Sequence, residues 1–318
     1  MNKNASALDM ANAIFGDGVT VVGASYSGSS YSSATYSGGD ATTPGITPGD
    51  TGVILSTGSV DYFTRPSGDP NQSTGISVNS GGRNNDPDFN AIAGARTFDA
   101  SYLEMSFVPD SDTMTVQFVF ASDEYPEYSS SIYNDIVGVW ANGTHVPLSI
   151  TSSPAAVGSV NQNENINLFQ SNAGDQFNTE MDGFTLTMTL TIPVNAGQVN
   201  TLKIGIADVG DNRYDSNLLI AGNSAQTSLI ANDDSITIQE GQTQTLDVLA
   251  NDTNGTSGTL VITHINGVAV QAGDTVVLQT GQFVTLNTDG TLEITTDNDN
   301  DTISFNYGVA SVGAIGNG

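Results

Sequence analysis

The chain lacks cysteine and is poor in basic residues, with 6 Lys and Arg against 34 Asp and Glu. Without cysteine it can form no disulfide, thiol nucleophile or zinc–thiolate site. The net charge of −28 argues against nucleic acid as a partner, because an acidic surface repels phosphate backbones. No apolar run approaches the roughly 18 residues of a membrane span, so we expect no membrane insertion. The two histidines, His145 and His264, lie far apart and leave little for acid–base catalysis.

What the chain has in abundance is aspartate, which makes up 27 of the 34 acidic residues. These acids occur in clusters rather than evenly along the sequence. Self-repulsion at this net charge destabilises a compact state, and bound divalent cations relieve it. Since 37% of the residues are apolar, there is enough material for a core. We therefore expect an ordered protein with Ca²⁺ as its cofactor. The alternative is an acidic surface that only confers solubility.

The hydrophobic pattern is mainly that of β-strands. A capping box at Ser6–Asp9 predicts one short N-terminal helix that ends at Gly16. From Val19 on, segments rich in Val, Ile, Thr and Phe are separated by clusters of Gly, Pro, Asn and Asp. We therefore predict an all-β protein. Its predicted parts are a large jelly-roll-like β-sandwich over 1–224, a linker over 225–230 and a small immunoglobulin-like β-sandwich with a Gly-rich tail over 231–318.

Acidic and amide side chains follow or precede several predicted strands of the first domain. They fall in two segments, 122–135 and 208–215, at the ends of strands. Ca²⁺ takes six to eight oxygen ligands from flexible loops, and the two segments together could supply them. The alternative is a pair of Asx turns, with Arg213 paired to a neighbouring acid. The predicted metal ligands here are Asp123, Glu124, Glu127, Asn134, Asp135, Asp208, Asp211 and Asp215.

A second candidate calcium site lies at the predicted domain junction. Asp233 and Asp234 stand at the start of the second domain, and Asp252 follows an apolar segment some twenty residues later. An ion bound by these three residues would stiffen the hinge between the domains.

Three tyrosines spaced by five, Tyr26, Tyr31 and Tyr36, lie in Gly- and Ser-rich sequence. They could stack on a ligand or a partner subunit, or they could anchor their own loops. Paired acids also raise the possibility of a glycosidase, with Glu124 or Glu127 as the acting carboxyl. The scarcity of glutamate and the Asn and Gly residues around the acids favour a cation site over catalysis.

Long ordered motifs of the first domain resemble the choice-of-anchor L domain, over about residues 5–222. The resemblance implies a β domain of the bacterial cell surface or of secreted proteins, with no established enzymatic activity. The family's usual Glu-Glu before Tyr-Pro is Asp123-Glu124 here, which keeps both carboxylates. The matching motifs are residues 52–58, 118–128, 134–135, 182–185, 206–211 and 214–216.

Residues 231–307 resemble the cadherin-like, VCBS-type repeats of bacterial adhesins, through 231–235 and 247–253. This resemblance implies extracellular calcium binding at domain junctions. Such repeats close with a further β-strand after the strand that ends at Tyr307, whereas this chain continues into the Gly-rich segment Gly308–Gly318. We therefore expect an edge strand to be missing. A missing strand invites a partner to supply one.

These features favour a non-enzymatic, calcium-stabilised structural protein. The first hypothesis is a homopolymer, a subunit of a surface filament or biofilm matrix assembled by strand exchange through its termini. The second is a monomeric, calcium-dependent adhesin that binds glycans or surfaces through the tyrosine loops, and the third is a calcium-dependent glycoside hydrolase. Met1–Asn4 does not lead into a signal peptide. We therefore expect an extracellular or bacterial cell-surface protein exported without an N-terminal signal peptide in this chain.

Overall fold

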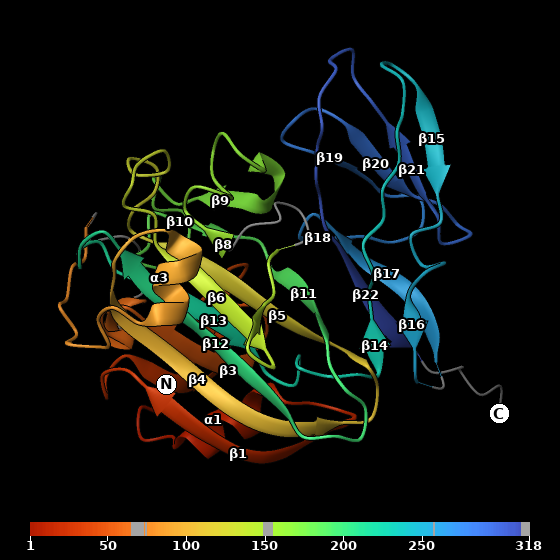
Figure 1. Ribbon diagram of the computed structural model, residues 1–318. Coiled ribbons are helices and arrows are strands. Elements are labelled where there is room, and N and C mark those ends of the chain that lie inside the picture. The colour runs from red at the N-terminus through yellow and green to blue at the C-terminus, as the bar shows by residue number, and fades with distance from the viewer. Residues whose placement is uncertain (65–72, 74, 149–154, 257, 313–318) are drawn as a thin grey trace. The chain divides into compact units, whose positions relative to one another are not determined.

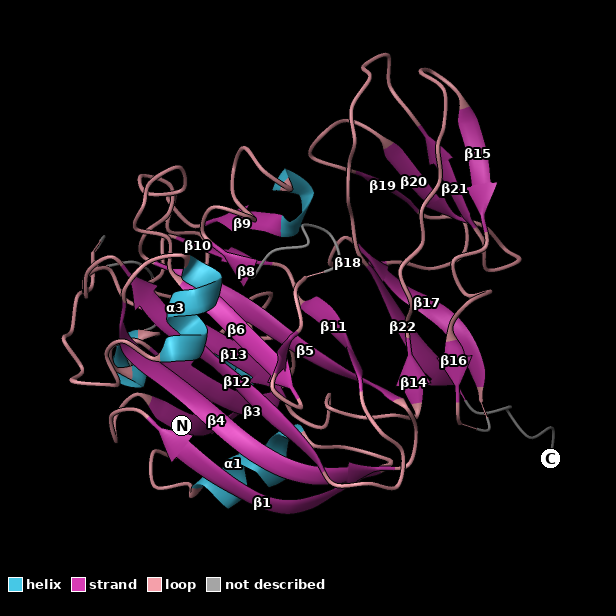
Figure 2. Ribbon diagram, viewed as in Figure 1, coloured by secondary structure: helices cyan, strands magenta, loops and turns pink. Residues whose placement is uncertain are grey.

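The computed structural model of the protein describes residues 1–64, 73, 75–148, 155–256 and 258–312. The chain divides into two compact units. The first comprises Met1–Glu164 and Phe169–Thr227, and the second comprises Asn165–Leu168 and Ser228–Gly318. Strands dominate both units (Figure 1, Figure 2), which confirms the predicted all-β fold.

One sheet of the first unit has six strands in the order β1-β4-β12-β6-β7, with β8 paired to β6. Its long central strands pair antiparallel. Polar and apolar residues alternate in β1, so that one face of this edge strand is more exposed than the other. The strands of this sheet are β1 Val19–Ser27, β4 Thr97–Pro109, β12 Asn200–Val209, β6 Ile136–Ala141, β7 Thr144–His145 and β8 Ala155–Ala156.

The other sheet has seven strands in the order β2-β3-β13-β5-β10-β9, with β11 paired to β5. Every residue of β13 is buried, and so is nearly all of β3 and β5. Strands covered on both faces consist of unbroken apolar runs rather than alternating residues, as Leu218-Leu219-Ile220 shows. The strands are β2 Ser33–Ser37, β3 Thr51–Ser56, β13 Ser216–Ala221, β5 Thr113–Ser122, β10 Gly183–Thr185, β9 Phe169–Ser171 and β11 Met188–Pro193.

Short helices lie beside the sheets. The predicted N-terminal helix is α1, Ala7–Ile14, and its first turn is closed by the reciprocal hydrogen bonds of Ser6 and Asp9. The sequence did not reveal α3, Pro87–Ala93, which begins at the N-cap Asp86 and buries Phe89. The remaining helical turns are α2 Gly39–Thr42, η1 Val60–Tyr62 and η2 Ile166–Leu168.

Lys203 ties α3 to the six-stranded sheet. Its ammonium donates to Asp86 Oδ1 at 2.9 Å and to Asp88 Oδ2 at 2.8 Å. The same ammonium lies 4.1 Å from the ring centroid of Tyr102 and 5.0 Å from that of Trp140. Because the Lys203 side chain is only 9% exposed, this is a buried ion pair. Removal of one partner of such a pair leaves the charge of the other less compensated inside the protein.

We expect Lys203→Met to lower the free energy of unfolding by about 3 kcal/mol, because the buried carboxylate of Asp86 loses its buried cation and keeps only the half-exposed Arg83, at 3.3 Å. Lys3→Met is the matched control. Lys3 pairs with Asp61 on the surface, where both side chains are about half exposed, and its loss should cost less than about 1 kcal/mol. Urea unfolding of both variants measures the difference. Equal losses of unfolding free energy would show that the buried ion pair at α3 stabilises the fold no more than a surface pair does.

The second unit consists of three small sheets around one core. Their orders are β14-β16, β15-β21-β20-β19 and β18-β17-β22. The core includes Ile265, Val284 and Leu292, each fully buried. The strands are β14 Leu229–Ile230, β16 Thr253–Asn254, β15 Thr243–Leu246, β21 Leu292–Thr295, β20 Phe283–Leu286, β19 Thr275–Val277, β18 Val268–Ala269, β17 Thr259–Ile265 and β22 Tyr307–Val312.

The expectation of a missing closing strand is wrong. Strand β22 begins at Tyr307, where the preceding strand was predicted to end, and continues through Val312 into the segment predicted to be a weak Gly-rich tail; it pairs antiparallel with β17. Val309 stands opposite Ile262 in this register, so the tail contributes apolar side chains in spite of its glycines. The hypothesis of strand exchange rested on an incomplete C-terminal sandwich, and this observation no longer supports it. Residues 313–318 of the predicted tail lie outside the described residues.

Tyr307 anchors the start of β22. Its hydroxyl lies within hydrogen-bond distance of Asn232 O, Asp234 Oδ2 and Val248 O, at 3.0–3.2 Å. We expect Tyr307→Phe to cost about 1–3 kcal/mol of unfolding free energy, since partly buried acceptors lose their donor. Tyr31→Phe, which removes one partly exposed hydrogen bond to Ser80 O, should cost less. Thermal unfolding of the two variants compares them, and a larger loss in Tyr31→Phe would contradict this assignment.

The six residues predicted to form a linker are tied into structure. Ala225 and Gln226 form bridges with Phe15 and Thr115 of the first unit. Leu229 and Ile230 form β14 of the second unit. The change from one unit to the other therefore takes place within Thr227–Ser228.

Candidate metal centre

The strand register of the seven-stranded sheet gathers three aspartates at one end. Ser122, the last residue of β5, stands opposite both Gly183 of β10 and Ser216 of β13. Asp123 follows Ser122, and an aspartate precedes each of its two partners: Asp182 before Gly183 and Asp215 before Ser216. Antiparallel pairing therefore brings these three acids to the same edge of the sheet.

The six-stranded sheet contributes two further aspartates. Asp135 immediately precedes β6, and Asp208 lies near the end of β12, beside the residue that pairs with the start of β6. Asp135 Oδ1 accepts from the Val209 N–H at 3.0 Å, and its Oδ2 accepts from the Ser216 hydroxyl at 2.7 Å. Because Ser216 belongs to the other sheet, this contact joins the two groups of acids.

The acids at this end of the first unit are almost fully buried. Each exposes no more than 6% of its surface. The ion pairs of the described residues include none of Asp123, Asp135, Asp208 and Asp215. We call this set the acidic cluster, and its members are Asp99, Asp123, Glu124, Asp135, Glu180, Asp182, Asp208 and Asp215.

Burial raises the pKa of several carboxyls of the cluster, and for most of these neighbouring acids raise it further. The pKa of Asp135 rises from 3.8 to about 7, and that of Asp215 also to about 7. Burial and the adjacent Asp135 raise the pKa of Glu124 to about 10. For Asp123 and Asp208 the pKa lies well above the usual value of a carboxyl, again with burial as the first cause. Proximity of these carboxyls to one another thus disfavours their charged forms.

Among the described residues, no hydrogen-bond donor reaches the buried oxygens Asp123 Oδ1, Asp208 Oδ1 and Asp215 Oδ2. The second oxygens of Asp123 and Asp215 are satisfied, by the N–H groups of Ile76 at 2.7 Å and Val78 at 2.9 Å. A buried acceptor without a donor is costly, so these oxygens call for a proton or a cation. Their donor chemistry suits Ca²⁺, which binds carboxylate oxygen.

The side chains do not surround an ion as they stand. Within the described ranges, no three or more His, Asp or Glu side chains form a group that could hold a metal ion. Binding of Ca²⁺ would therefore require some of the carboxylates to turn toward a common point. The predicted calcium site stays a prediction.

Two comparisons bear on what the chain is. The sequence pattern of the Choice-of-anchor L domain matches residues 1–226, which is most of the chain. The chain belongs to the choice-of-anchor L domain family. A second pattern, that of the Bacterial Ig domain, matches residues 223–313. Both predicted resemblances are confirmed in the predicted order. A search of the curated proteins finds no match.

The two domains together indicate a cell-surface, adhesion-like protein. Neither the choice-of-anchor L domain nor the Ig domain is an enzyme family. Among the described residues, no helix has the length and apolar character needed to cross a membrane.

Not all predicted ligands of the choice-of-anchor L domain join the cluster. Glu127 is exposed on the loop after β5. Asn134 Oδ1 accepts from the Gly158 N–H at 2.6 Å, and Asp211 Oδ1 accepts from the Arg213 N–H at 3.2 Å. The Asp211 contact is the Asx-type turn considered as the alternative, although it involves the backbone of Arg213 rather than its guanidinium.

The cluster also contains acids that the sequence did not single out. Asp182 lies in a motif that carried the family resemblance, but without a role assigned to it. Asp99 lies within a β-strand, where an acid usually faces solvent, and its φ of 44° marks an unusual backbone. Its Oδ2 accepts from the Ser80 N–H at 3.1 Å, a contact between distant segments that no local pattern reveals.

In the Ig domain, Asp234 and Asp252 lie close to each other near Tyr307. Asp234 Oδ2 accepts from the Tyr307 hydroxyl, and Asp252 Oδ1 accepts from the Asn232 N–H at 2.8 Å. Burial raises the pKa of both, with Asp247 adding to the effect. Asp233 contributes its backbone carbonyl, which accepts from the Asn251 amide. The second calcium site stays a prediction, and Asp247 lies close enough to Asp234 and Asp252 to raise the pKa of both.

The three tyrosines do not form a common platform. The Tyr26 hydroxyl bonds to Ser29 O and Ser101, and the Tyr31 hydroxyl donates to Ser80 O at 3.0 Å. Tyr36 is 8% exposed and belongs to a core cluster of the choice-of-anchor L domain. Tyr26 and Tyr36 thus have the anchoring role that was the alternative to ligand binding, and Tyr31 is the most exposed of the three.

Proposed function

We propose that this chain is a non-enzymatic, calcium-stabilised adhesion module of a bacterial surface. The acidic cluster is the observation that carries the proposal. It holds several buried carboxyls with raised pKa values and no cation among the described residues. Charges of one sign that are buried together lower the free energy of unfolding. A divalent cation bound among them turns this repulsion into attraction and so raises the free energy of unfolding.

Asp123, Asp208 and Asp215 are the residues that would hold the ion, because each has one buried oxygen without a donor. When bound, Ca²⁺ supplies two positive charges beside carboxylates that make no ion pair with a described residue. Asp135 would act beside them, since it already joins the two sheets through Val209 and Ser216. The ion would thereby fasten the strand ends of both sheets.

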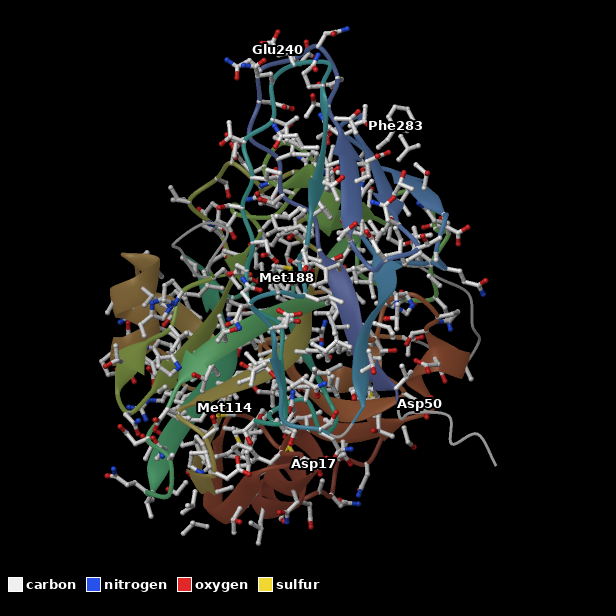
Figure 3. All side chains as sticks on the ribbon, turned by 90° about the vertical axis from the view of Figure 1, so that its right-hand side faces the viewer. Asp17, Asp50, Met114, Met188, Glu240 and Phe283 are labelled. Carbon is white, nitrogen blue, oxygen red and sulfur yellow. The ribbon has the colours of Figure 1, made fainter. Side chains whose placement is uncertain are left out.

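Calcium titration of the metal-depleted chain by calorimetry at pH 8 tests the proposal. We expect saturable heat of binding that Asp208→Asn reduces. Asp17→Asn, at an exposed aspartate (Figure 3), is the matched control and should bind as the unaltered chain does. Absence of binding, or equal binding by both variants, would contradict the proposal.

The burial of Glu124 speaks against the glycosidase alternative. Glu124 is 1% exposed, and its Oε2 accepts from the Asp135 N–H at 3.1 Å. A general acid or nucleophile must reach the glycosidic bond of its substrate, which a carboxyl enclosed in this way does not do. Glu127 is accessible but lies on the surface, apart from the buried acids.

Self-association into a homopolymer is the second candidate, and one observation favours it. Val277 of the edge strand β19 stands opposite Phe283 of β20, and the two side chains are 57% and 48% exposed. Phe283 projects from the second unit (Figure 3). An exposed apolar edge strand is a template for pairing with another chain.

Sedimentation of the chain at high concentration in millimolar calcium tests self-association. We expect assemblies that Phe283→Ser dissolves, while Val199→Ser, at an apolar residue 63% exposed in the first unit, leaves them intact. A strictly monomeric chain would remove this candidate and leave the adhesion module unaffected.

A further inference from the structure

The face of the six-stranded sheet beside α3 carries two rows of side chains that the strand register aligns. Ser25 of β1 stands opposite Glu104 of β4, Glu104 opposite Lys203 of β12, and Lys203 opposite Trp140 of β6. In the adjacent row Ser106 of β4 stands opposite Thr201 of β12. Cross-strand partners point to the same face of a sheet, so these residues share one surface.

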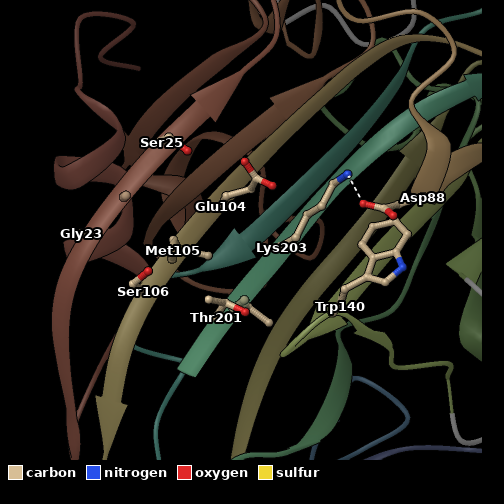
Figure 4. A pocket seen from close by; sticks show the side chains of 12 residues that line it. Gly23, Ser25, Asp88, Glu104, Met105, Ser106, Trp140, Thr201 and Lys203 are labelled. Carbon is tan, nitrogen blue, oxygen red and sulfur yellow. Dashed lines mark hydrogen bonds and ion pairs between the residues drawn. The ribbon is translucent and has the colours of Figure 1, made fainter. Parts of the chain in front are cut away.

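This surface forms a groove with a volume of about 490 Å³. Figure 4 shows Glu104, Lys203, Asp88 and Trp140 around it, with Thr201 along one side. The volume lies in the range of about 300–1,000 Å³ that is typical of small-molecule sites. The groove is separate from the acidic cluster, none of whose members lines it.

The ammonium of Lys203 is held in place before any ligand arrives, whereas Glu104 is free to turn toward one. Two of the three N–H donors of Lys203 are directed to Asp86 and Asp88, and the side chain is fixed against the rings of Phe89, Tyr102 and Trp140. Its third N–H donor has no acceptor within the described ranges. Glu104 is exposed and makes no hydrogen bond or ion pair within the described ranges, so its carboxylate can accept two. Fixed polar groups lose little entropy on binding.

The charges in the groove select against ionic ligands. A polyanion would face the carboxylates of Asp88 and Glu104. A cation would find only Glu104 as a free partner, because Asp88 is already paired with the ammonium of Lys203. A neutral molecule with many hydroxyls meets neither obstacle: its O–H groups donate to the carboxylates, and its oxygens accept from Lys203, Ser106 and Thr201.

We propose that this groove binds uncharged carbohydrate, as a short segment of a neutral glycan. The inference deepens the proposed adhesion function and rests on it, since it names the ligand class and the place where the ligand binds. It also moves glycan recognition away from the tyrosine loops, where Tyr26 and Tyr36 are engaged in anchoring. Specificity would come from Glu104, which is exposed and central to the row.

Trp140 provides a direct readout, because it is the single tryptophan of the chain and lines the groove. The full chain in millimolar calcium chloride is screened on an array of neutral and acidic oligosaccharides. Each oligosaccharide that binds is then titrated while Trp140 fluorescence is recorded. We expect binding of neutral oligosaccharides with a change in the fluorescence of Trp140. Pentalysine serves as the cationic probe and should leave the fluorescence of Trp140 unchanged.

Glu104→Gln should weaken binding of the neutral oligosaccharide at least tenfold without changing the melting temperature, since Glu104 is exposed. Glu240→Gln, at an exposed glutamate of the second unit, and Tyr31→Ala, in the tyrosine loops, should bind as the unaltered chain does. The inference is overturned by no binding on the array, by a change of Trp140 fluorescence with pentalysine alone, by full affinity in Glu104→Gln, or by loss of affinity in Tyr31→Ala. A chain that binds calcium but no glycan overturns this inference only, whereas a chain that binds glycan but no calcium overturns the calcium proposal only.

Discussion

Metal-free protein is expected to lose stability as the pH rises from about 4 to about 7. Asp135 and Asp215 hold their protons in the folded state up to about pH 7, whereas in the unfolded chain they release them near 3.8. Between these values the folded state binds more protons than the unfolded state, so raising the pH favours unfolding. Each such proton contributes about 1.4 kcal/mol per pH unit, and the two together amount to several kcal/mol.

Calcium should reverse this trend. Ca²⁺ binds the deprotonated carboxylates, so its contribution grows as the protons leave. Urea unfolding at pH 5 and at pH 8, each with chelator and with millimolar calcium, gives the four free energies that are needed. We expect the chelated protein to be more stable at pH 5 and the calcium-loaded protein to be more stable at pH 8. The same pH dependence in both conditions would show that the cluster titrates without an ion.

Asp208→Asn should have opposite effects with and without calcium. Asp208 is fully buried among other acids, and the hydroxyl of Thr57 bonds to its side chain. Asparagine keeps an acceptor for Thr57 and removes the charge. In chelator at pH 8 we expect the variant to be more stable than the unaltered protein by about 1–3 kcal/mol, since a buried like charge is gone.

In calcium the order should invert. Loss of a site that is filled at 100 times its dissociation constant costs about 2.7 kcal/mol. The difference in unfolding free energy between Asp208→Asn and the unaltered protein should therefore change by about 4–6 kcal/mol between chelator and calcium. Denaturant unfolding in the two buffers measures it, with Asp17→Asn as the control that should not swing. A variant that is destabilised equally in both buffers would mean that Asp208 has a structural role unconnected with the ion.

Features that depend on residues close together in the chain could be predicted from the sequence. The alternation of polar and apolar residues and the turn residues between strands predict an all-β protein. The capping box at Ser6 and Asp9 predicts α1, because capping depends on residues three apart. Placement of Asp123, Asp135, Asp208 and Asp215 at strand ends followed from the strands themselves, since an acid beside an apolar run must leave the sheet or be buried.

Features set by long-range register were beyond the sequence. The row from Ser25 to Trp140 exists only because four strands distant in the chain align. Strand β22 was missed since glycine has low strand propensity, yet pairing with β17 and the apolar side chains of Val309 and Ala310 outweigh that preference. Helix α3 is short, and the ion pairs that stabilise it come from Lys203, more than 100 residues later.

The central claim is that a divalent cation neutralises the acidic cluster, and thermal unfolding at pH 8 with and without chelator tests it most directly. Purified protein in 2 equivalents or more of calcium is compared with the same protein after chelation, with magnesium as the second cation. The account predicts a substantially lower melting temperature after chelation, restored by calcium. Magnesium should restore less of it, because it demands a stricter octahedral geometry than flexible carboxylates provide. An unchanged melting temperature after chelation would contradict the account.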